Sequence, residues 1–186
     1  MARRKSISDE QVLDDLLALA AETGPDGLTF ARAGEACGLS PATLVQRYGN
    51  REALVEAVLL RAWDRLDALT ADADAAVPLT PAGAVELLMR LTPDEQAEAH
   101  MTDGLLLLRE DIRNPKLRAR GAAWGRTLAH ALGRRLSEDP ELAERRGWQM
   151  ASLWQGAHVW WAFRREAPAA DAIRLMLEDW LADLKR

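Results

Sequence analysis

The stretch from residue 28 to residue 54 constrains the fold most, because it holds start and stop signals for two short helices. Thr29 is a candidate N-cap, since its hydroxyl can accept a hydrogen bond from an amide that the first helical turn leaves unpaired. Gly38 can adopt the left-handed conformation that ends a helix. Ser40 can cap a second helix, and Pro41 suits the first position of that helix. The pattern predicts a helix-turn-helix, which presents its second helix to the DNA major groove.

The same stretch resembles the DNA-binding head of the TetR family of transcriptional regulators. In that family a Gly-hydrophobic-Ser turn precedes a recognition helix and exit of the form TLY-x-HF-x-x-K-x-x-L. The resemblance covers roughly the first third of the chain, and it implies a DNA-binding head, a connecting helix and a C-terminal domain for ligand binding and dimerisation. The matching residues are Gly38-Leu39-Ser40, Thr43-Leu44-Val45, Arg47-Tyr48, Arg51 and Leu54.

Several residues depart from the family pattern. Val45 stands where the family usually has a tyrosine that touches a DNA phosphate, Arg47 replaces His or Tyr, and Arg51 replaces Lys. Gly34 lies inside the first motif helix, where glycine costs about 1 kcal/mol relative to alanine, so we expect close packing there. The two arginines keep the recognition segment cationic. DNA binding is therefore expected, with contacts that differ from the usual family set.

The recognition helix and its exit supply the candidate DNA contacts. Gln46 can pair with adenine through two hydrogen bonds, and Arg47 can pair with guanine or a phosphate. Thr43 can donate to a phosphate, as the resemblance implies, and Arg51 lies beside a helix N-terminus that favours one. For each residue the alternative is a solvated surface side chain. The predicted DNA-binding residues are Ser40, Pro41, Ala42, Thr43, Val45, Gln46, Arg47 and Arg51.

Helical periodicity runs through the rest of the chain, and no strand pattern appears. Ser8 and Gln11 form a possible capping box at the start of the first helix, and prolines mark the later helix starts. The expected fold is all-α with about nine helices. Residues 1–52 form the expected DNA-binding domain, and residues 53–186 the ligand-binding and dimerisation domain. Outside the motif, helices are expected over residues 9–23, 51–71, 82–91, 94–111, 115–136, 140–165 and 169–185.

The last two helices are too apolar to be isolated surface helices. Their apolar runs cover residues 148–163 and 173–184, and Gly156 would let another helix approach closely. Two such helices from each subunit would form the four-helix bundle that the resemblance implies for a homodimer. A two-fold dimer also suits a palindromic DNA site. The alternative is that both helices are buried within their own subunit.

The C-terminal region holds six of the seven tryptophans, so it is the expected effector site. An apolar pocket lined by aromatic side chains and a few polar groups is the usual small-molecule site, and a tryptophan face can also hold a cation. The effector is therefore expected to be hydrophobic or aromatic, and a cationic one stays open. The alternative is that these residues form the core or the dimer interface. The predicted lining is Met89, Trp124, Met150, Trp154, His158, Trp160 and Phe163.

Catalytic and metal-binding patterns are not found in the sequence. His100, His130 and His158 fall in separate expected helices, without a spacing such as H-E-x-x-H. Neither a phosphate-binding glycine loop nor a nucleophile elbow occurs, so we expect no enzyme activity, no metal and no cofactor. Cys37 is expected to be a buried structural thiol, and Leu44 and Tyr48 are expected in the core of the head.

The remaining composition fits a cytoplasmic protein. A single cysteine suits a reducing compartment, and no signal peptide or membrane-spanning run is apparent. The net charge of −5 argues against non-specific coating of nucleic acid. We therefore expect a DNA-binding regulator, a repressor that a small hydrophobic effector releases from a palindromic operator. The alternative is a helical small-molecule-binding or adaptor protein whose head binds DNA weakly or not at all.

Overall fold

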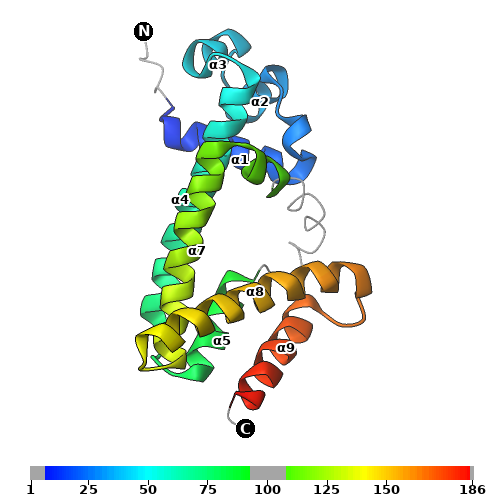
Figure 1. Cartoon of the computed structure of the whole chain (residues 1–186). Helices are drawn as coiled ribbons and strands as arrows, with labels where there is room; N and C mark the ends of the chain where they lie inside the picture. The colour runs from blue at the N-terminus through cyan, green and yellow to red at the C-terminus, as the bar shows by residue number, and fades with distance from the viewer. Residues whose placement is uncertain (1–6, 93–107, 185–186) are drawn as a thin grey trace. The chain divides into compact units, whose positions relative to one another are not determined.

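The computed structural model describes residues 7–92 and 108–184, and these ranges contain helices and no strands. The chain divides into two compact units, Met1–Arg65 with Thr102–Arg120, and Leu66–Met101 with Gly121–Arg186. None of the described helices is long and apolar enough to cross a membrane. The helices labelled in Figure 1 are α1 (Asp9–Thr23), α2 (Phe30–Cys37), α3 (Pro41–Tyr48), α4 (Arg51–Ala76), α5 (Pro81–Leu91), α7 (Pro115–Leu136), α8 (Pro140–Arg164) and α9 (Ala169–Asp183), and a short 3₁₀ turn covers Pro25–Gly27.

The start and stop signals of the first unit lie where the sequence predicts them. The Thr29 hydroxyl accepts from the Arg32 amide, and the Ser40 hydroxyl accepts from the Thr43 amide. Gly38 has φ 66° and ψ 26°, the left-handed conformation that ends α2. Ser8 likewise caps α1 by accepting from the Gln11 amide. The side-chain amide of Gln11 donates to Asp15 at 2.9 Å.

The core of the first unit gathers one apolar face from each of its helices. Leu16 of α1, Leu44 of α3 and Leu54 of α4 are fully buried, and Leu117 of α7 joins them. Gly34 confirms the expected close packing, because a Cβ built on it would lie 2.6 Å from the Leu39 carbonyl oxygen. A side chain at residue 34 would therefore push α2 away from the turn that leads into α3.

The second unit packs α5, α8 and α9 around the C-terminal part of α7. A Cβ on Gly147 of α8 would lie 2.0 Å from the Ala129 carbonyl oxygen, and one on Gly133 of α7 would lie 2.3 Å from that of Ala143. These two glycines let α7 and α8 approach backbone to backbone. The largest fully buried side chains of this core are Leu87, Leu88, Leu128, Leu132, Met150, Ile173 and Leu177.

Arg135 holds the end of α4 within the second unit. Its side chain is fully buried, and all five N–H donors of the guanidinium have an acceptor. Nη1 donates to the Asp74 carboxylate at 2.5 Å, and Arg134 pairs with the same carboxylate. The remaining acceptors are the carbonyl oxygens of Asp74, Val77, Pro78 and Ala131.

The helix boundaries agree with the predicted ones except at the end of α4. This helix continues to Ala76, whereas the sequence predicts an end near residue 71. The Asp74 carbonyl in its last turn, and those of Val77 and Pro78 just after it, accept from the distant Arg135, which local sequence signals do not reveal. The predicted helix over 94–111 lies largely outside the described residues, of which 108–113 are helical. His100 also lies outside them.

Candidate nucleic-acid interface

The exposed face of α3 carries most of the predicted DNA contacts. Leu44 is fully buried and fixes the orientation of the helix, whereas Val45 is 44% exposed. Thr43 is half-buried, and its hydroxyl oxygen lies 2.8 Å from that of Ser40. Because the Ser40 hydroxyl also accepts from the Thr43 amide at 3.1 Å, this pair fixes the first turn of α3. The predicted contacts exposed on this helix and its cap are Ser40, Pro41, Ala42, Val45, Gln46 and Arg47.

Arg47 lies in the last turn of α3 and pairs with Asp9 in the first turn of α1. Its Nη1 lies 2.9 Å from Asp9 Oδ1, and the side chain is 28% exposed. The contact joins two segments that are 38 residues apart in the sequence. The guanidinium is thus held at the edge of the exposed face of α3 and already has an anionic partner.

Arg51 is anchored within the head. Nε donates to the Leu28 carbonyl oxygen at 3.1 Å, and Nη2 donates to that of Pro25 at 2.7 Å. The Asp26 carboxylate lies 3.4 Å from Nη2. These partners tie the start of α4 to the turn before α2, a role that sequence reasoning missed. A phosphate contact by Arg51 stays a prediction.

Tyr48 and Cys37 pack into the head, as predicted. The Cys37 side chain is buried, and its thiol lies 2.9 Å from the Ala33 carbonyl oxygen. The Tyr48 hydroxyl is buried and has no hydrogen-bond partner. Burial raises the pKa of this phenol, and the nearby Asp9 carboxylate adds to the rise. Tyr48 therefore carries an unpaired polar group into an apolar core.

Three of the predicted effector-site residues lie together in the second unit. The ring centroids of Trp124 and Trp154 are 6.5 Å apart, and His158 meets Trp154 edge-on at 4.8 Å. The indole N–H groups of Trp124 and Trp154 donate to the hydroxyls of Thr70 and Thr92, each at 3.0 Å. The sequence analysis did not single out these two threonines.

His158 adds to this group of aromatic side chains a hydrogen-bond acceptor that has no donor. Its Nδ1 lies 2.8 Å from the Trp154 carbonyl oxygen, which can only accept, so the Nδ1 atom carries the proton. Nε2 is buried and has no partner. Burial lowers the pKa of this imidazole, while the hydrogen bond to the Trp154 carbonyl partly opposes the shift. The neutral ring is therefore favoured, with Nε2 as an acceptor.

The other predicted lining residues do not share one environment. Met150 is fully buried in the core, and Met89 packs against the core from a partly buried position. Trp160 and Phe163 are 64% and 76% exposed, with ring centroids 6.0 Å apart. The helical period of α8 turns Trp154 inward and these two rings outward. They do not lie with the Trp124, Trp154 and His158 group.

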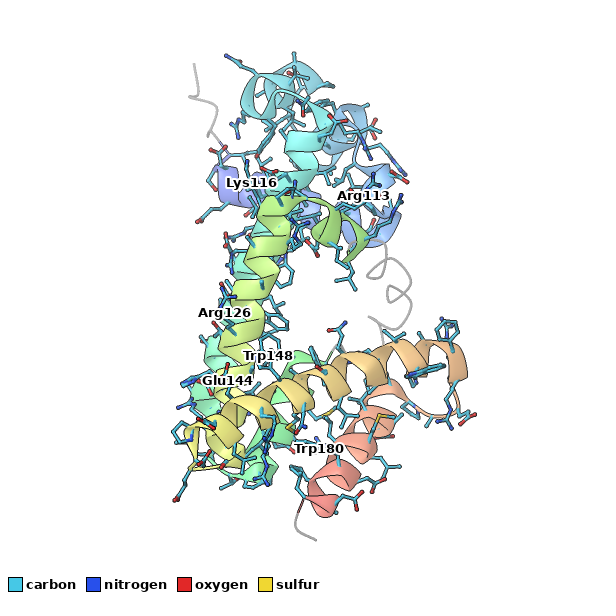
Figure 2. All side chains as sticks on the ribbon, in the orientation of Figure 1. Arg113, Lys116, Arg126, Glu144, Trp148 and Trp180 are labelled. Atoms are coloured by element: carbon cyan, nitrogen blue, oxygen red, sulfur yellow. The ribbon has the colours of Figure 1, made fainter. Side chains whose placement is uncertain are left out.

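Trp160 lines a cavity of about 320 Å³ formed with Trp161, Ala172, Leu175 and Met176. A larger open groove of about 860 Å³ runs along the first half of α8. Figure 2 labels three of the side chains that line it, Glu144, Trp148 and Trp180. Trp148 and Trp160 of α8 are exposed, and Trp180 of α9 is half-buried.

Comparison with known proteins identifies the head. Residues 12–58 match the sequence model of the family described as bacterial regulatory proteins, tetR family. Residues 12–58 are therefore similar to the DNA-binding domain of that family. The matched range contains the whole helix-turn-helix and the start of α4, so the resemblance found in the sequence is confirmed. No curated protein matches the chain.

Solved structures show the same fold across nearly the whole chain. A transcriptional regulator from Rhodococcus sp. Rha1 is 17% identical with a TM-score of 0.75, covering 95% of this chain and 97% of its own. A putative transcriptional regulator from Pseudomonas aeruginosa PAO1 is 17% identical with a TM-score of 0.74, covering 98% and 94%. A TetR transcriptional regulator from Legionella pneumophila is 18% identical with a TM-score of 0.69, covering 95% and 98%. The expected all-α TetR-type fold is confirmed.

Proposed function

We propose that the protein is a homodimeric repressor, released from a palindromic operator by a small hydrophobic or aromatic effector. It would act without catalysis, in the cytoplasm, with residues 1–52 binding DNA and residues 53–186 binding effector and partner subunit. The observation that carries the proposal is the capped helix α3. Leu44 anchors the helix in the core, while Ala42, Val45 and Gln46 are exposed. Such a helix can enter a major groove without unfolding any part of the head.

Base and phosphate contacts would divide between these side chains. The amide of Gln46 suits adenine, and the small apolar groups of Ala42 and Val45 suit a thymine methyl. Thr43, Arg47 and Arg51 are the proposed phosphate contacts, which fix register and affinity. Because Arg51 has three partners inside the head, its contribution to DNA binding would be smaller than that of Arg47.

Homodimer formation through α8 and α9 has its support in their exposed aromatic and aliphatic side chains. Trp148, Trp160, Phe163 and Leu175 are all more than two-fifths exposed, an unusual apolar surface for a monomer. The space beside Gly156 is open, so a second helix could approach closely there. Gly156→Leu should therefore leave the monomer folded and shift sedimentation toward a monomer. A dimer that persists with Gly156→Leu would contradict this interface.

The proposed effector site centres on Trp124, Trp154 and His158. The two indoles favour an aromatic or hydrophobic ligand, and the bare Nε2 atom of His158 favours one with a hydrogen-bond donor. Release would require the effector to bind the non-operator state more tightly than the operator-bound state. Movement of α4 would then change the separation of the two recognition helices, which must match half-sites about 34–36 Å apart per helical turn.

The proposal is tested with DNA from upstream of the gene that encodes the chain. Binding of the wild type is measured at two salt concentrations, beside Arg47→Ala, Thr43→Ala and the matched control Arg126→Ala on an exposed part of α7. Specific binding should weaken steeply with salt. Arg47→Ala should weaken binding most, Thr43→Ala less and Arg126→Ala least. Unchanged affinity in both α3 variants would refute the placement of the interface.

The competing function is that of a helical small-molecule-binding or adaptor protein. Val45 and Asp9 favour it, because the first removes a phosphate-binding hydroxyl from the family pattern and the second neutralises part of the Arg47 charge. Absence of binding to any duplex in a randomised pool would support this alternative and refute the repressor.

A further inference from the structure

The pair between Asp9 and Arg47 lies at the edge of the proposed DNA-binding face. Asp9 Oδ1 and Arg47 Nη1 are 2.9 Å apart, and the carboxylate remains 77% exposed. Asp9 lies in the first turn of α1, where a negative charge is also favoured by the helix dipole. The carboxylate therefore faces solvent on the same side of the head as the end of the recognition helix.

A carboxylate and a DNA phosphate compete for the same guanidinium donors. Both present two oxygens that match the planar fork of arginine. A phosphate that approached Arg47 would have either to displace Asp9 or to share the guanidinium with it. In both cases a carboxylate would lie close to the DNA backbone, and the repulsion between like charges would oppose binding.

We propose that Asp9 is an intramolecular competitor that lowers the DNA affinity of the head by occupying Arg47. This inference rests on the proposed function, since it requires α3 to bind DNA. Asp9 would set how tightly the regulator holds any sequence, because it acts on a charge contact rather than on a base contact. Weak general affinity would confine stable binding to sites at which the base contacts are also correct.

Four variants test the competition, with binding to a mixed-sequence duplex of about 30 base pairs, long enough for two half-sites. Asp9→Asn removes the charge and keeps the shape. Glu10→Gln is the matched control, because Glu10 is exposed in the same helical turn. Arg47→Gln and the double variant Asp9→Asn with Arg47→Gln complete a double-mutant cycle. Fluorescence anisotropy is recorded over a series of salt concentrations.

Asp9→Asn should bind the duplex about threefold to fivefold more tightly at low salt, the range expected from a surface ion pair. The slope of log affinity against log salt concentration should become more negative by up to about one. The freed guanidinium can then neutralise one more phosphate, and the DNA releases the counterion of that phosphate. Glu10→Gln should change affinity by less than about twofold. In the Arg47→Gln background, Asp9→Asn should have no larger effect than Glu10→Gln.

Each contrary result has a distinct meaning. Weaker or unchanged binding by Asp9→Asn overturns the competition. The pair would then only stabilise the packing of α1 against α3. A gain that persists without Arg47 also overturns it, because the charge of Asp9 would then act on DNA directly. If the wild type and Glu10→Gln fail to bind at the lowest salt, the proposed function fails, and this inference fails with it.

Discussion

The exposed faces of α3 and α8 offer different things to a partner. On α3 the exposed side chains are small or polar apart from Val45, and a cation lies at the edge of the face. On α8 the exposed side chains include Trp148, Trp160 and Phe163. Small and polar groups suit the floor of a DNA groove, whereas exposed aromatic rings suit an apolar partner. The exposed faces of these two helices therefore differ in chemistry, one small and polar and the other aromatic.

The interiors of the two units also differ. The core of the first unit holds apolar residues together with the unpaired Tyr48 hydroxyl. The second unit also leaves His158 Nε2 without a partner, but it buries a whole guanidinium, that of Arg135, with every donor satisfied. A satisfied buried charge fixes geometry, whereas an unpaired hydroxyl only costs free energy.

The largest effect is expected at Arg135. Arg135→Ala removes five hydrogen bonds, four of them to residues 74–78 at and just after the end of α4, and leaves the Asp74 carboxylate with Arg134 alone. Breaking a buried pair in this way should lower the free energy of unfolding by about 3–5 kcal/mol, as measured by urea denaturation. The matched control is Arg134→Ala, which loses a 39% exposed partner of the same carboxylate and should cost about 1 kcal/mol or less. Equal losses in the free energy of unfolding for the two variants would show that burial of Arg135 does not determine its contribution to stability.

Neighbouring residues of α3 should differ in their contribution to stability. Leu44 is fully buried and Val45 is 44% exposed, so truncation of each to alanine tests opposite faces of one helix. Leu44→Ala should lower the free energy of unfolding by about 2–5 kcal/mol, whereas Val45→Ala should change it by about 0.5 kcal/mol or less. Thermal unfolding measures both. A large loss of stability with Val45→Ala would mean that α3 presents a different face.

Tyr48→Phe should raise the stability of the head. The substitution keeps the ring in the core and removes a buried hydroxyl that has no partner. The expected gain is about 1 kcal/mol, because an unpaired buried polar group carries a desolvation cost. Urea denaturation of the two proteins gives the difference. A loss of stability would reveal a partner for the hydroxyl in solution.

The smallest effect concerns two carboxyl groups with opposite pKa shifts. Burial raises the pKa of Asp111, in the first unit, despite the hydrogen bond from the Trp63 indole. Hydrogen bonds from Arg134 and Arg135 lower the pKa of Asp74, in the second unit, although burial alone would raise this pKa.

Acidification should therefore act on the two carboxyl groups with opposite signs. As the pH falls through the folded-state pKa of Asp74, its stabilising contribution is lost, whereas protonation of Asp111 near its own raised pKa favours folding. Asp111→Asn should raise the free energy of unfolding at pH 7 by a few tenths of a kcal/mol. Urea denaturation at pH 7 and at pH 4 measures the difference, which should shrink at the lower pH. A loss of stability at pH 7 would contradict the burial argument.

The sequence predicts the head well because its determining signals are local. Thr29, Gly38, Ser40 and Pro41 each act within one helical turn, so their roles can be read without the rest of the chain. The contacts of Arg135 and Arg47 join residues that are distant in the sequence, and no periodic pattern reveals them. The same limit explains why Trp154 and Trp160 were grouped in one predicted lining. Composition shows that they are aromatic, but only the phase of α8 shows that Trp154 faces the core and Trp160 faces solvent.

The central claim is that a dimer places two copies of α3 in the major groove of one operator. The most direct test is selection from a randomised duplex pool by the full-length protein. The account predicts enrichment of a palindrome, with half-site centres about one or two helical turns apart. It also predicts loss of the enriched sequence with Arg47→Ala, while Arg126→Ala on α7 retains it. Failure to enrich any sequence, or enrichment of a single unpaired half-site, would contradict the account.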